Sequence, residues 1–273
     1  MVEGAGPVTK TKTVPANSRR TFNVKDDIGE KDASIKVTSN VAVIPERAMY
    51  HDNRKAGHDS IGTTAPANSY YLAEGTSAWG FTTYVLVQNP NSQPNTVTVT
   101  YMTGGGPKAQ APFAMGPNSR KTIRVNDVLP NTDFSTRVSG TLPLIAERAM
   151  YWNNGQGEAM HDSIGMSAPH TTFYLPDGEA EPGHTETWTL VQNPNASAVQ
   201  VQMTYVKDQA SNVTFTETIP ANSRRTFNMA DKTTGMAGVI VTSKTAGAKI
   251  MVERAMYWEN KLAGSDTIGG YSD

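Results

Sequence analysis

Two segments of the chain place histidine, aspartate and serine in a row, which is the residue set of a hydrolytic triad. The phrase HDSIG occupies 58–62 and 161–165, and it returns as SDTIG at 265–269. A triad needs convergent side chains, whereas adjacent residues of an extended segment point in alternating directions. The third phrase lacks the histidine, and no G-x-S-x-G motif occurs. We therefore expect no enzyme and no catalytic residue; the alternative is a hydrolase that depends on His161.

Residues that could hold a metal ion are scattered along the chain. There is no cysteine, and the 5 histidines form no H-x-x-x-H pair. The loop 176–184 combines Asp177, Glu179, Glu181 and His184, but it departs from the calcium-binding pattern of an EF-hand. The glycine-rich segment 103–108 lacks the Gly-Lys-Ser/Thr ending of a phosphate-binding loop. The sequence predicts no metal site and no cofactor, and it favours a solvated acidic loop and a hairpin turn at these places.

A Glu–Arg pair closes three apolar runs, each time within the phrase ERAMY: Glu46–Arg47, Glu147–Arg148 and Glu253–Arg254. In a regular strand the two side chains point to opposite faces, so one charge should lean inward. A buried charge is costly unless it is paired and hydrogen-bonded. Because the pair occurs in every copy, we interpret it as a structural repeat position that pairs with a neighbouring strand or caps loop carbonyls. The alternative is a ligand or catalytic site.

Carbohydrate recognition would need exposed aromatic rings, because sugar faces stack on flat side chains. Of the 4 tryptophans, Trp152 and Trp258 follow ERAMY and Trp188 occupies a strand position. Trp79 is the one that falls in a predicted loop, so it is the candidate ligand-binding residue of a carbohydrate-binding accessory module.

The elements that must position these residues are repeated along the chain. ERAMY begins at residues 46, 147 and 253, so the spacings are 147 − 46 = 101 and 253 − 147 = 106. The phrase PANSRRTFNV at 15–24 is matched at 116–125 and 220–229, and YVLVQNPN at 84–91 is matched at 188–195. A fixed period of this length is typical of repeated modules. We predict a partial unit at 1–66 and further units at 67–169 and 170–273. The alternative phase starts each unit near GPVTKTKTV and leaves the partial copy at the C-terminal end.

Each predicted unit is built from short β-strands. TVTVTY at 96–101 alternates strictly, as expected for a strand with one buried face. Asn-Pro, Gly-Gly and Pro-Asn separate runs rich in Val, Thr, Tyr and Ile. In the middle copy the predicted strands are SYYLAEG, TTYVLVQN, NTVTVTYMT, KAQAPFAM, SRKTIRVN, FSTRVSG and LPLIAERAMYW. This pattern predicts an all-β fold of tandem immunoglobulin-like β-sandwiches, with the polar stretch after ERAMY as a linker or surface loop.

Composition excludes several classes of protein. The 273 residues carry 24 basic and 25 acidic side chains, and this balance argues against a nucleic-acid partner. No stretch reaches the roughly 18–20 apolar residues of a transmembrane helix, so no membrane insertion is expected. The first residues, MVEGAGPVTKTKTV, have no charged region followed by an apolar one, so no signal peptide is expected within them.

These phrases resemble a family of tandem repeats of roughly a hundred residues in large secreted or cell-surface bacterial proteins. The matching segments are Tyr71–Gly75, Tyr84–Asn91, Val97–Met102, Ser119–Thr122, Glu147–Trp152 and Gly157–Gly165. The resemblance implies an extracellular or cell-surface location and a non-enzymatic structural or adhesive role. Expected partners are a surface glycan or protein, or a second copy that supplies the strands missing from the incomplete repeat and so forms a filament.

Overall fold

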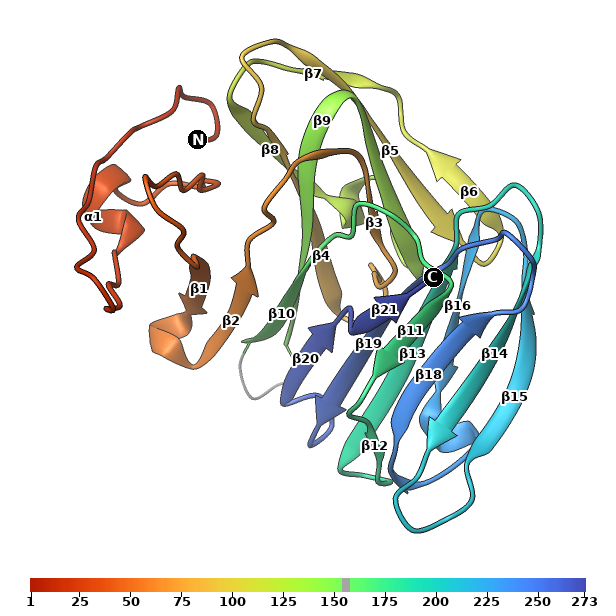
Figure 1. Ribbon diagram of the computed structural model, residues 1–273. Coiled ribbons are helices and arrows are strands. Elements are labelled where there is room, and N and C mark those ends of the chain that lie inside the picture. The colour runs from red at the N-terminus through yellow and green to blue at the C-terminus, as the bar shows by residue number, and fades with distance from the viewer. Residues whose placement is uncertain (154–157) are drawn as a thin grey trace.

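The computed structural model describes residues 1–153 and 158–273, and Gly157 of the segment named above lies outside them. The fold is nearly all β, with antiparallel sheets arranged in a sandwich-like manner (Figure 1). The all-β prediction is therefore confirmed. Within the described residues, no helix is both long enough and apolar enough to cross a membrane.

The middle part of the chain forms two layers that share one strand. Its strands are β3 (Ala67–Leu72), β4 (Phe81–Asn89), β5 (Asn95–Thr103), β6 (Gly106–Ala109), β7 (Phe113–Met115), β8 (Ser119–Arg124), β9 (Phe134–Asn153) and β10 (Glu158–Ile164). The first half of β9 pairs with β3 and β5, and its second half pairs with β4 and β10. Val97, Val99 and Tyr101 of β5 are buried between the layers, as the alternation predicts.

The last part of the chain has the same pairing order. Its strands are β11 (Thr172–Leu175), β12 (Glu179–Ala180), β13 (Thr185–Asn193), β14 (Val199–Val206), β15 (Val213–Ile219), β16 (Ser223–Asn228), β17 (Gly235–Met236), β18 (Gly238–Ser243), β19 (Met251–Trp258), β20 (Ala263–Thr267) and β21 (Gly270–Ser272). One sheet runs β15-β14-β18-β11-β21 and another runs β16-β13-β19-β20. Here β18 and β19 take the places of the two halves of β9.

The first part of the chain is different. It holds α1 (Val24–Ile28), β1 (Glu46–His51), the 3-10 turn η1 (Asp52–Arg54) and β2 (Ala56–Ile61). Two further 3-10 turns, η2 (Val125–Asp127) and η3 (Met229–Asp231), follow β8 and β16. Residues 1–45, all of them described, contain no named strand, so a strand after the turn at 15–18 is not formed. The matching segments β8 and β16 gain their partners from β4 and β13, and residues 1–66 contain no counterpart of those strands.

Two further expectations about strands need correction. The stretch after ERAMY is not a linker, because HDSIG and its counterpart form most of β2, β10 and β20 and pair with the ERAMY strands. The predicted strands at 134–140 and 142–152 are one strand, β9. At the point where β9 passes between layers, Asn95 accepts hydrogen bonds from Thr141 and from the Leu142 amide. The same side chain donates to the Leu142 carbonyl. These bonds satisfy the backbone where regular pairing stops.

Asparagine side chains hold the turns after β4 and β13. The Asn193 amide is fully buried and donates to the carbonyls of Ser197, Ile219 and Pro220. Its Oδ1 accepts two hydrogen bonds from Asn195. Asn89 has the same arrangement with Asn91 in the QNPN phrase after β4. The phrase is therefore a turn clamp built by buried amides.

Candidate functional site: charge clusters between three hairpins

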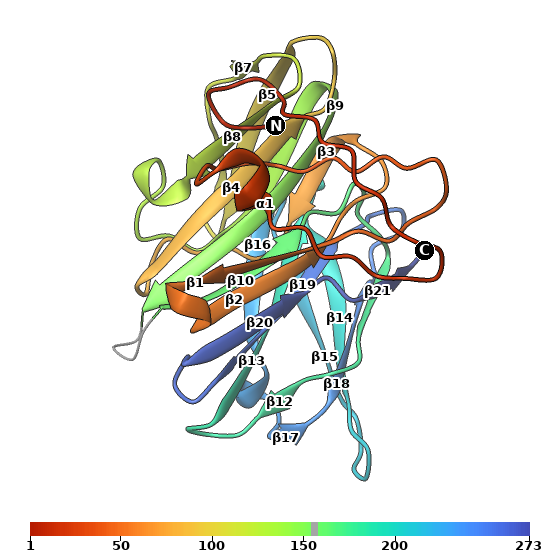
Figure 2. The same ribbon diagram turned by 90° about the vertical axis from the view of Figure 1, so that its left-hand side faces the viewer.

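The ERAMY and HDSIG phrases form three antiparallel hairpins. Hairpin 1 is β1–β2 (46–61), hairpin 2 is the end of β9 with β10 (147–153 and 158–164), and hairpin 3 is β19–β20 (251–267). Hairpin 1 lies beside hairpin 2, and hairpin 2 lies beside hairpin 3 (Figure 2). The glutamate and arginine of each ERAMY therefore face different neighbours, as strand geometry requires.

The contact between hairpins 2 and 3 is centred on Arg148, whose side chain is fully buried. Its guanidinium binds Glu253 through Nη1, and through Nη2 it binds Asp266 at 2.9 Å. Glu74 follows β3, and its carboxylate lies 3.0 Å from Nη2. The backbone carbonyl of Glu74 accepts a hydrogen bond from Nη1. One guanidinium thus faces three buried carboxyl groups, and its planar fork suits such multiple pairing.

Other buried groups complete this inner cluster. The Glu253 carboxylate accepts a hydrogen bond of 2.7 Å from the Ala73 amide. Tyr257 donates to Glu74 at 3.0 Å, and the Tyr257 hydroxyl lies 3.1 Å from His161 Nε2. The cluster is therefore a connected network that ties hairpins 2 and 3 to the end of β3.

Burial dominates the titration of the inner cluster. Desolvation raises the pKa of Glu253 to about 8 and that of Asp266 to about 8, although Arg148 opposes both shifts. Burial, followed by the charge of Arg148, holds the pKa of His161 well below its usual value. The network therefore retains carboxyl protons near neutral pH, and His161 is neutral there.

The contact between hairpins 1 and 2 repeats the arrangement with Arg47 as the cation. Arg47 binds Glu147 at 2.5 Å and also binds Asp162. His58 Nδ1 lies 2.9 Å from Asp162. Burial raises the pKa of Glu147 to about 8. Burial would also raise the pKa of Asp162, but hydrogen bonds with His58 and Glu147 and the Arg47 charge hold it below its usual value.

The clusters offer little room for catalysis or metal binding. Carboxyl oxygens of Glu74, Glu253 and Asp266 lie within 4.8 Å of one another, which is ligand spacing for a cation, but the Arg148 guanidinium binds all three. His161 faces Tyr257 of hairpin 3, whereas Asp162 faces Arg47 of hairpin 1. The His-Asp pair of the phrase thus serves two different contacts, and its side chains do not converge as a triad requires.

The other predicted residues lie away from these clusters. Trp79 is in the segment between β3 and β4, 79% exposed, and its Nε1 donates to Asp133 at 3.3 Å. In the acidic loop, Glu179 accepts from Thr185 and His184 pairs with Glu259, so these groups do not gather around one point. The glycine-rich segment 103–108 is the turn between β5 and β6.

Sequence reasoning missed several cluster residues. Glu74 and Asp266 were not singled out, and neither was Arg224, a buried arginine of the NSRR phrase that donates to the Gly75 carbonyl. A signal for the aspartate was present, because Asp59, Asp162 and Asp266 occupy the same place in all three phrases even where the histidine is lost.

Comparisons with known proteins assign no family. No protein-family model matches the chain, and no curated protein matches it. Among solved structures, the crystal structure of Thermotoga maritima 1070 is 12% identical, with a TM-score of 0.36, and the match covers 38% of this chain and 96% of that one. The Anabaena sensory rhodopsin transducer is 17% identical, with a TM-score of 0.28, over 31% of this chain and 97% of that one. The exported protein XepA of PBSX is 10% identical, with a TM-score of 0.24, over 94% of this chain and 99% of that one.

Proposed function

We propose that this chain is a non-enzymatic array of immunoglobulin-like β-sandwich repeats, with a partial unit at 1–66 and units at 67–169 and 170–273. Its role is to space or present other parts of an extracellular or cell-surface bacterial protein. The observation that carries the proposal is the set of ion pairs that the repeated Glu–Arg residues form between neighbouring hairpins. Arg47 and Arg148 each bind the glutamate and aspartate of the next hairpin, so the shared residues join neighbouring hairpins. Repetition of the same joint between successive hairpins suits an architectural module.

A rigid joint can be tested by small-angle X-ray scattering of the wild type and of Arg148→Ala. Measured on single chains, the wild type should scatter as one body with the dimensions of the structure, and the variant should become larger and more flexible if it stays folded. A wild type that already scatters as a flexible chain of beads would contradict the spacer role. Turnover of any ester, peptide or glycoside that disappears in His161→Ala would replace the proposal with the hydrolase alternative.

A second candidate, a carbohydrate-binding accessory module, is favoured by Trp79. Its ring is 79% exposed, and its Nε1 is held by Asp133, so a flat apolar surface is presented in a fixed orientation. Binding on a glycan array that is lost in Trp79→Ala, and retained in a variant of the exposed Tyr174, would support this function. Equal binding by wild type and Trp79→Ala would remove it.

Filament formation by strand complementation is supported by the state of residues 1–45. Segments that resemble strand-forming parts of the other copies have no strand partner here. A strand from another subunit could pair with them. Hydrogen exchange of residues 1–45 would slow on association if this mode operates.

A further inference from the structure

The contacts between the hairpins have a direction. The arginine of one hairpin always binds the glutamate and aspartate of the following one, first Arg47 with Glu147 and Asp162, then Arg148 with Glu253 and Asp266. Two half-contacts are therefore left over. Within the described residues, Glu46 and Asp59 of hairpin 1 have no cation partner. Arg254 of hairpin 3 pairs with Asp177 but lacks the glutamate and aspartate of a following hairpin.

We propose that these two half-contacts bind each other between molecules, so that hairpin 3 of one chain stacks on hairpin 1 of a second copy. The chains would associate head to tail through a third contact of the kind already present twice within each molecule. This inference names a partner for the proposed structural role and rests on that role.

The face of hairpin 3 that contacts hairpin 2 has a counterpart on hairpin 1 with a similar sequence and backbone. Hairpin 1 reads ERAMYHDNRKAGHDSIG at 46–62, and hairpin 3 with its exit reads ERAMYWENKLAGSDTIG at 253–269. Both turns contain three consecutive non-glycine residues with positive φ, at 52–54 and at 259–261. The Arg54 guanidinium lies over the Tyr50 ring as the Lys261 amine lies over the Tyr257 ring. Such an unusual shared turn fixes the same surface on both hairpins.

On hairpin 3 this surface already holds a tryptophan. Trp152 packs edge to face on Tyr257, with ring centroids 5.4 Å apart, and its Nε1 donates to the Lys261 carbonyl at 2.7 Å. A Cβ added to Gly264 would lie 2.8 Å from Trp152, so the glycine is needed for the ring to approach. Hairpins 2 and 3 thus join through an arginine among carboxyl groups and a tryptophan seated on tyrosine and glycine.

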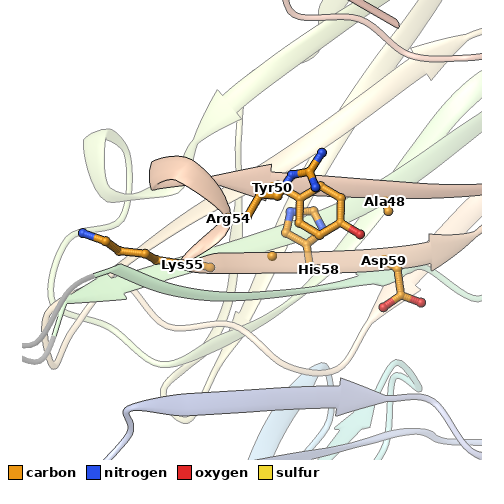
Figure 3. A pocket seen from close by; sticks show the side chains of 8 residues that line it. Ala48, Tyr50, Arg54, Lys55, His58 and Asp59 are labelled. Carbon is orange, nitrogen blue, oxygen red and sulfur yellow. The ribbon is translucent and has the colours of Figure 1, made fainter. Parts of the chain in front are cut away.

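On hairpin 1 the surface that corresponds to the Trp152-binding surface of hairpin 3 is exposed. Tyr50, Gly57 and Arg54 occupy the places of Tyr257, Gly264 and Lys261, and Tyr50 is 62% exposed. A hollow of about 240 Å³ lies over these residues, and Tyr50, Arg54 and Asp59 border it (Figure 3). Because an apolar cavity of about 150 Å³ admits benzene, this hollow has room for an indole ring. Glu46 and Asp59 are exposed, and among the described residues neither has a hydrogen bond or ion pair.

Hairpin 3 offers the complementary groups on its outer face. Arg254 is only 7% exposed. Its Nη1 donates to the Asp177 carbonyl and lies 3.4 Å from the Asp177 carboxylate, as Arg148 contacts the carbonyl and carboxylate of Glu74. In the described part of the chain the Nη2 of Arg254 has no acceptor, whereas Nη2 of Arg148 binds Asp266. Trp258, the counterpart of Trp152, is half-buried, and no described aromatic ring packs on it. Arg254 and Trp258 share one face of β19, because they lie four residues apart in a strand.

A contact between two different faces is heterologous, so it propagates in one direction and does not close into a two-fold dimer. It also differs from strand complementation, because hairpins stack through side chains and exchange no backbone hydrogen bonds. Opposite charges on the two faces should steer their encounter, and salt should weaken it.

The first experiment measures mass against concentration by sedimentation velocity and light scattering. The wild type should form a ladder of oligomers that shortens at high salt. Glu46→Lys changes only an exposed side chain, so the fold should survive, and its association should weaken about tenfold or more. Trp258→Ala should weaken association similarly, and circular dichroism checks that it is folded. Asp208→Lys, which reverses another exposed acidic residue, is the matched control and should associate as the wild type does.

Mixing two end-blocked chains tests the polarity. Glu46→Lys leaves hairpin 3 intact, and Arg254→Glu leaves hairpin 1 intact. At a concentration where the wild type associates but the weakened contact does not form, each should be monomeric alone, and an equimolar mixture should give a one-to-one dimer and nothing larger. If Arg254→Glu fails to fold, Trp258→Ala takes its place in the mixture.

Two results would overturn the inference. One is a wild type that stays monomeric at all concentrations and low salt, and the other is association that Glu46→Lys leaves unchanged. Neither result would touch the proposed spacer role, which fails separately if the single chain is flexible or shows turnover lost in His161→Ala.

Discussion

The guanidinium of one residue, Arg148, pairs with three deeply buried carboxyl groups of this protein. Among the described residues, Arg148 is the arginine or lysine that pairs with Glu74, Glu253 and Asp266, and all four side chains are nearly inaccessible to water. Removing one partner of a buried ion pair leaves uncompensated charge, which costs far more than the pair gains over an apolar replacement. The arginine should therefore dominate local stability.

Arg148→Met should lower the free energy of unfolding by about 3–5 kcal/mol, because the carboxyl groups would keep their desolvation without a cation. Urea denaturation followed by fluorescence measures this loss. Arg124→Met is the control, since Arg124 pairs with Asp127 on the surface and its loss should cost less than about 1 kcal/mol. Equal losses in the two variants would contradict the central role of Arg148.

The raised pKa values make stability depend on pH. Glu253 and Asp266 have pKa values of about 8 in the folded chain, well above those of free carboxyl groups, so the folded state keeps protons that the unfolded state loses. Their stabilising effect is complete at low pH and is lost as pH rises toward 8. The neutral His161, whose pKa is lowered by burial, acts in the opposite direction below about pH 6.5.

Comparing the wild type with Glu253→Gln separates these effects. The variant removes one group that holds a proton, so its stability relative to the wild type should improve with rising pH, by up to about 1.4 kcal/mol per unit between pH 5 and 8. Urea melts at each pH give the difference. Glu217→Gln, which removes a half-buried carboxylate paired with the exposed Arg225, should shift stability by less than about 1 kcal/mol throughout. A flat difference for Glu253→Gln would show that Glu253 holds no extra proton.

At the scale of elements, the turns depend on asparagine as much as the strands depend on apolar alternation. The Asn193 side chain forms five hydrogen bonds, three as donor and two as acceptor, and none of its surface is exposed. Its loss would leave buried carbonyls unpaired at the turn that orders β13, β14 and β16.

Asn193→Ala should therefore cost about 2–4 kcal/mol in thermal or urea unfolding. Asn68→Ala, which removes an exposed amide with a single long bond to the Gly140 carbonyl, should cost less than about 1 kcal/mol. If the two substitutions were equivalent, the clamp would have no special energetic role.

Local pattern was enough to predict most strands but not their ends or partners. Val97, Val99 and Tyr101 alternate with threonines, so β5 could be predicted directly. The hairpin strand β10 was missed because His161, Asp162 and Ser163 are polar, and polarity usually marks a loop. These residues are buried only because hairpins lie on both sides of them, which is information that a single segment does not contain.

At the scale of the whole molecule, the same limit applies to the candidate site. The sequence predicts that one charge of each Glu–Arg pair needs a partner, but the partners lie about a hundred residues away in another copy. Arg148 is 105 residues from Glu253 and 118 from Asp266. Only the stacking of hairpins brings them together. Because the units are repeats, the contacts of Arg47 in one pair of hairpins predict those of Arg148 in the next.

The stacking also joins the two sandwich-like parts into one core. Phe81, Met150 and Trp152 belong to the same buried cluster as Phe173 and Tyr257. A shared core makes the unfolding of one part expose apolar surface of the other. The two parts should therefore unfold together, unlike domains joined by a linker.

Differential scanning calorimetry tests this coupling. In the wild type, the two sandwich-like parts should unfold in a single transition, for which the van't Hoff and calorimetric enthalpies agree. Trp152→Ala should remove about 3–5 kcal/mol from the junction while leaving the rest of each core in place, so the transition should broaden or split in two. Trp79→Ala is the matched control, because that ring is exposed and is not part of the shared core, and its transition should stay single. Two transitions in the wild type would mean that the buried charges and aromatic rings between the hairpins do not couple the two parts. A single sharp transition in Trp152→Ala would mean that other contacts of the junction supply the coupling, and Arg148 would be the first of these to test.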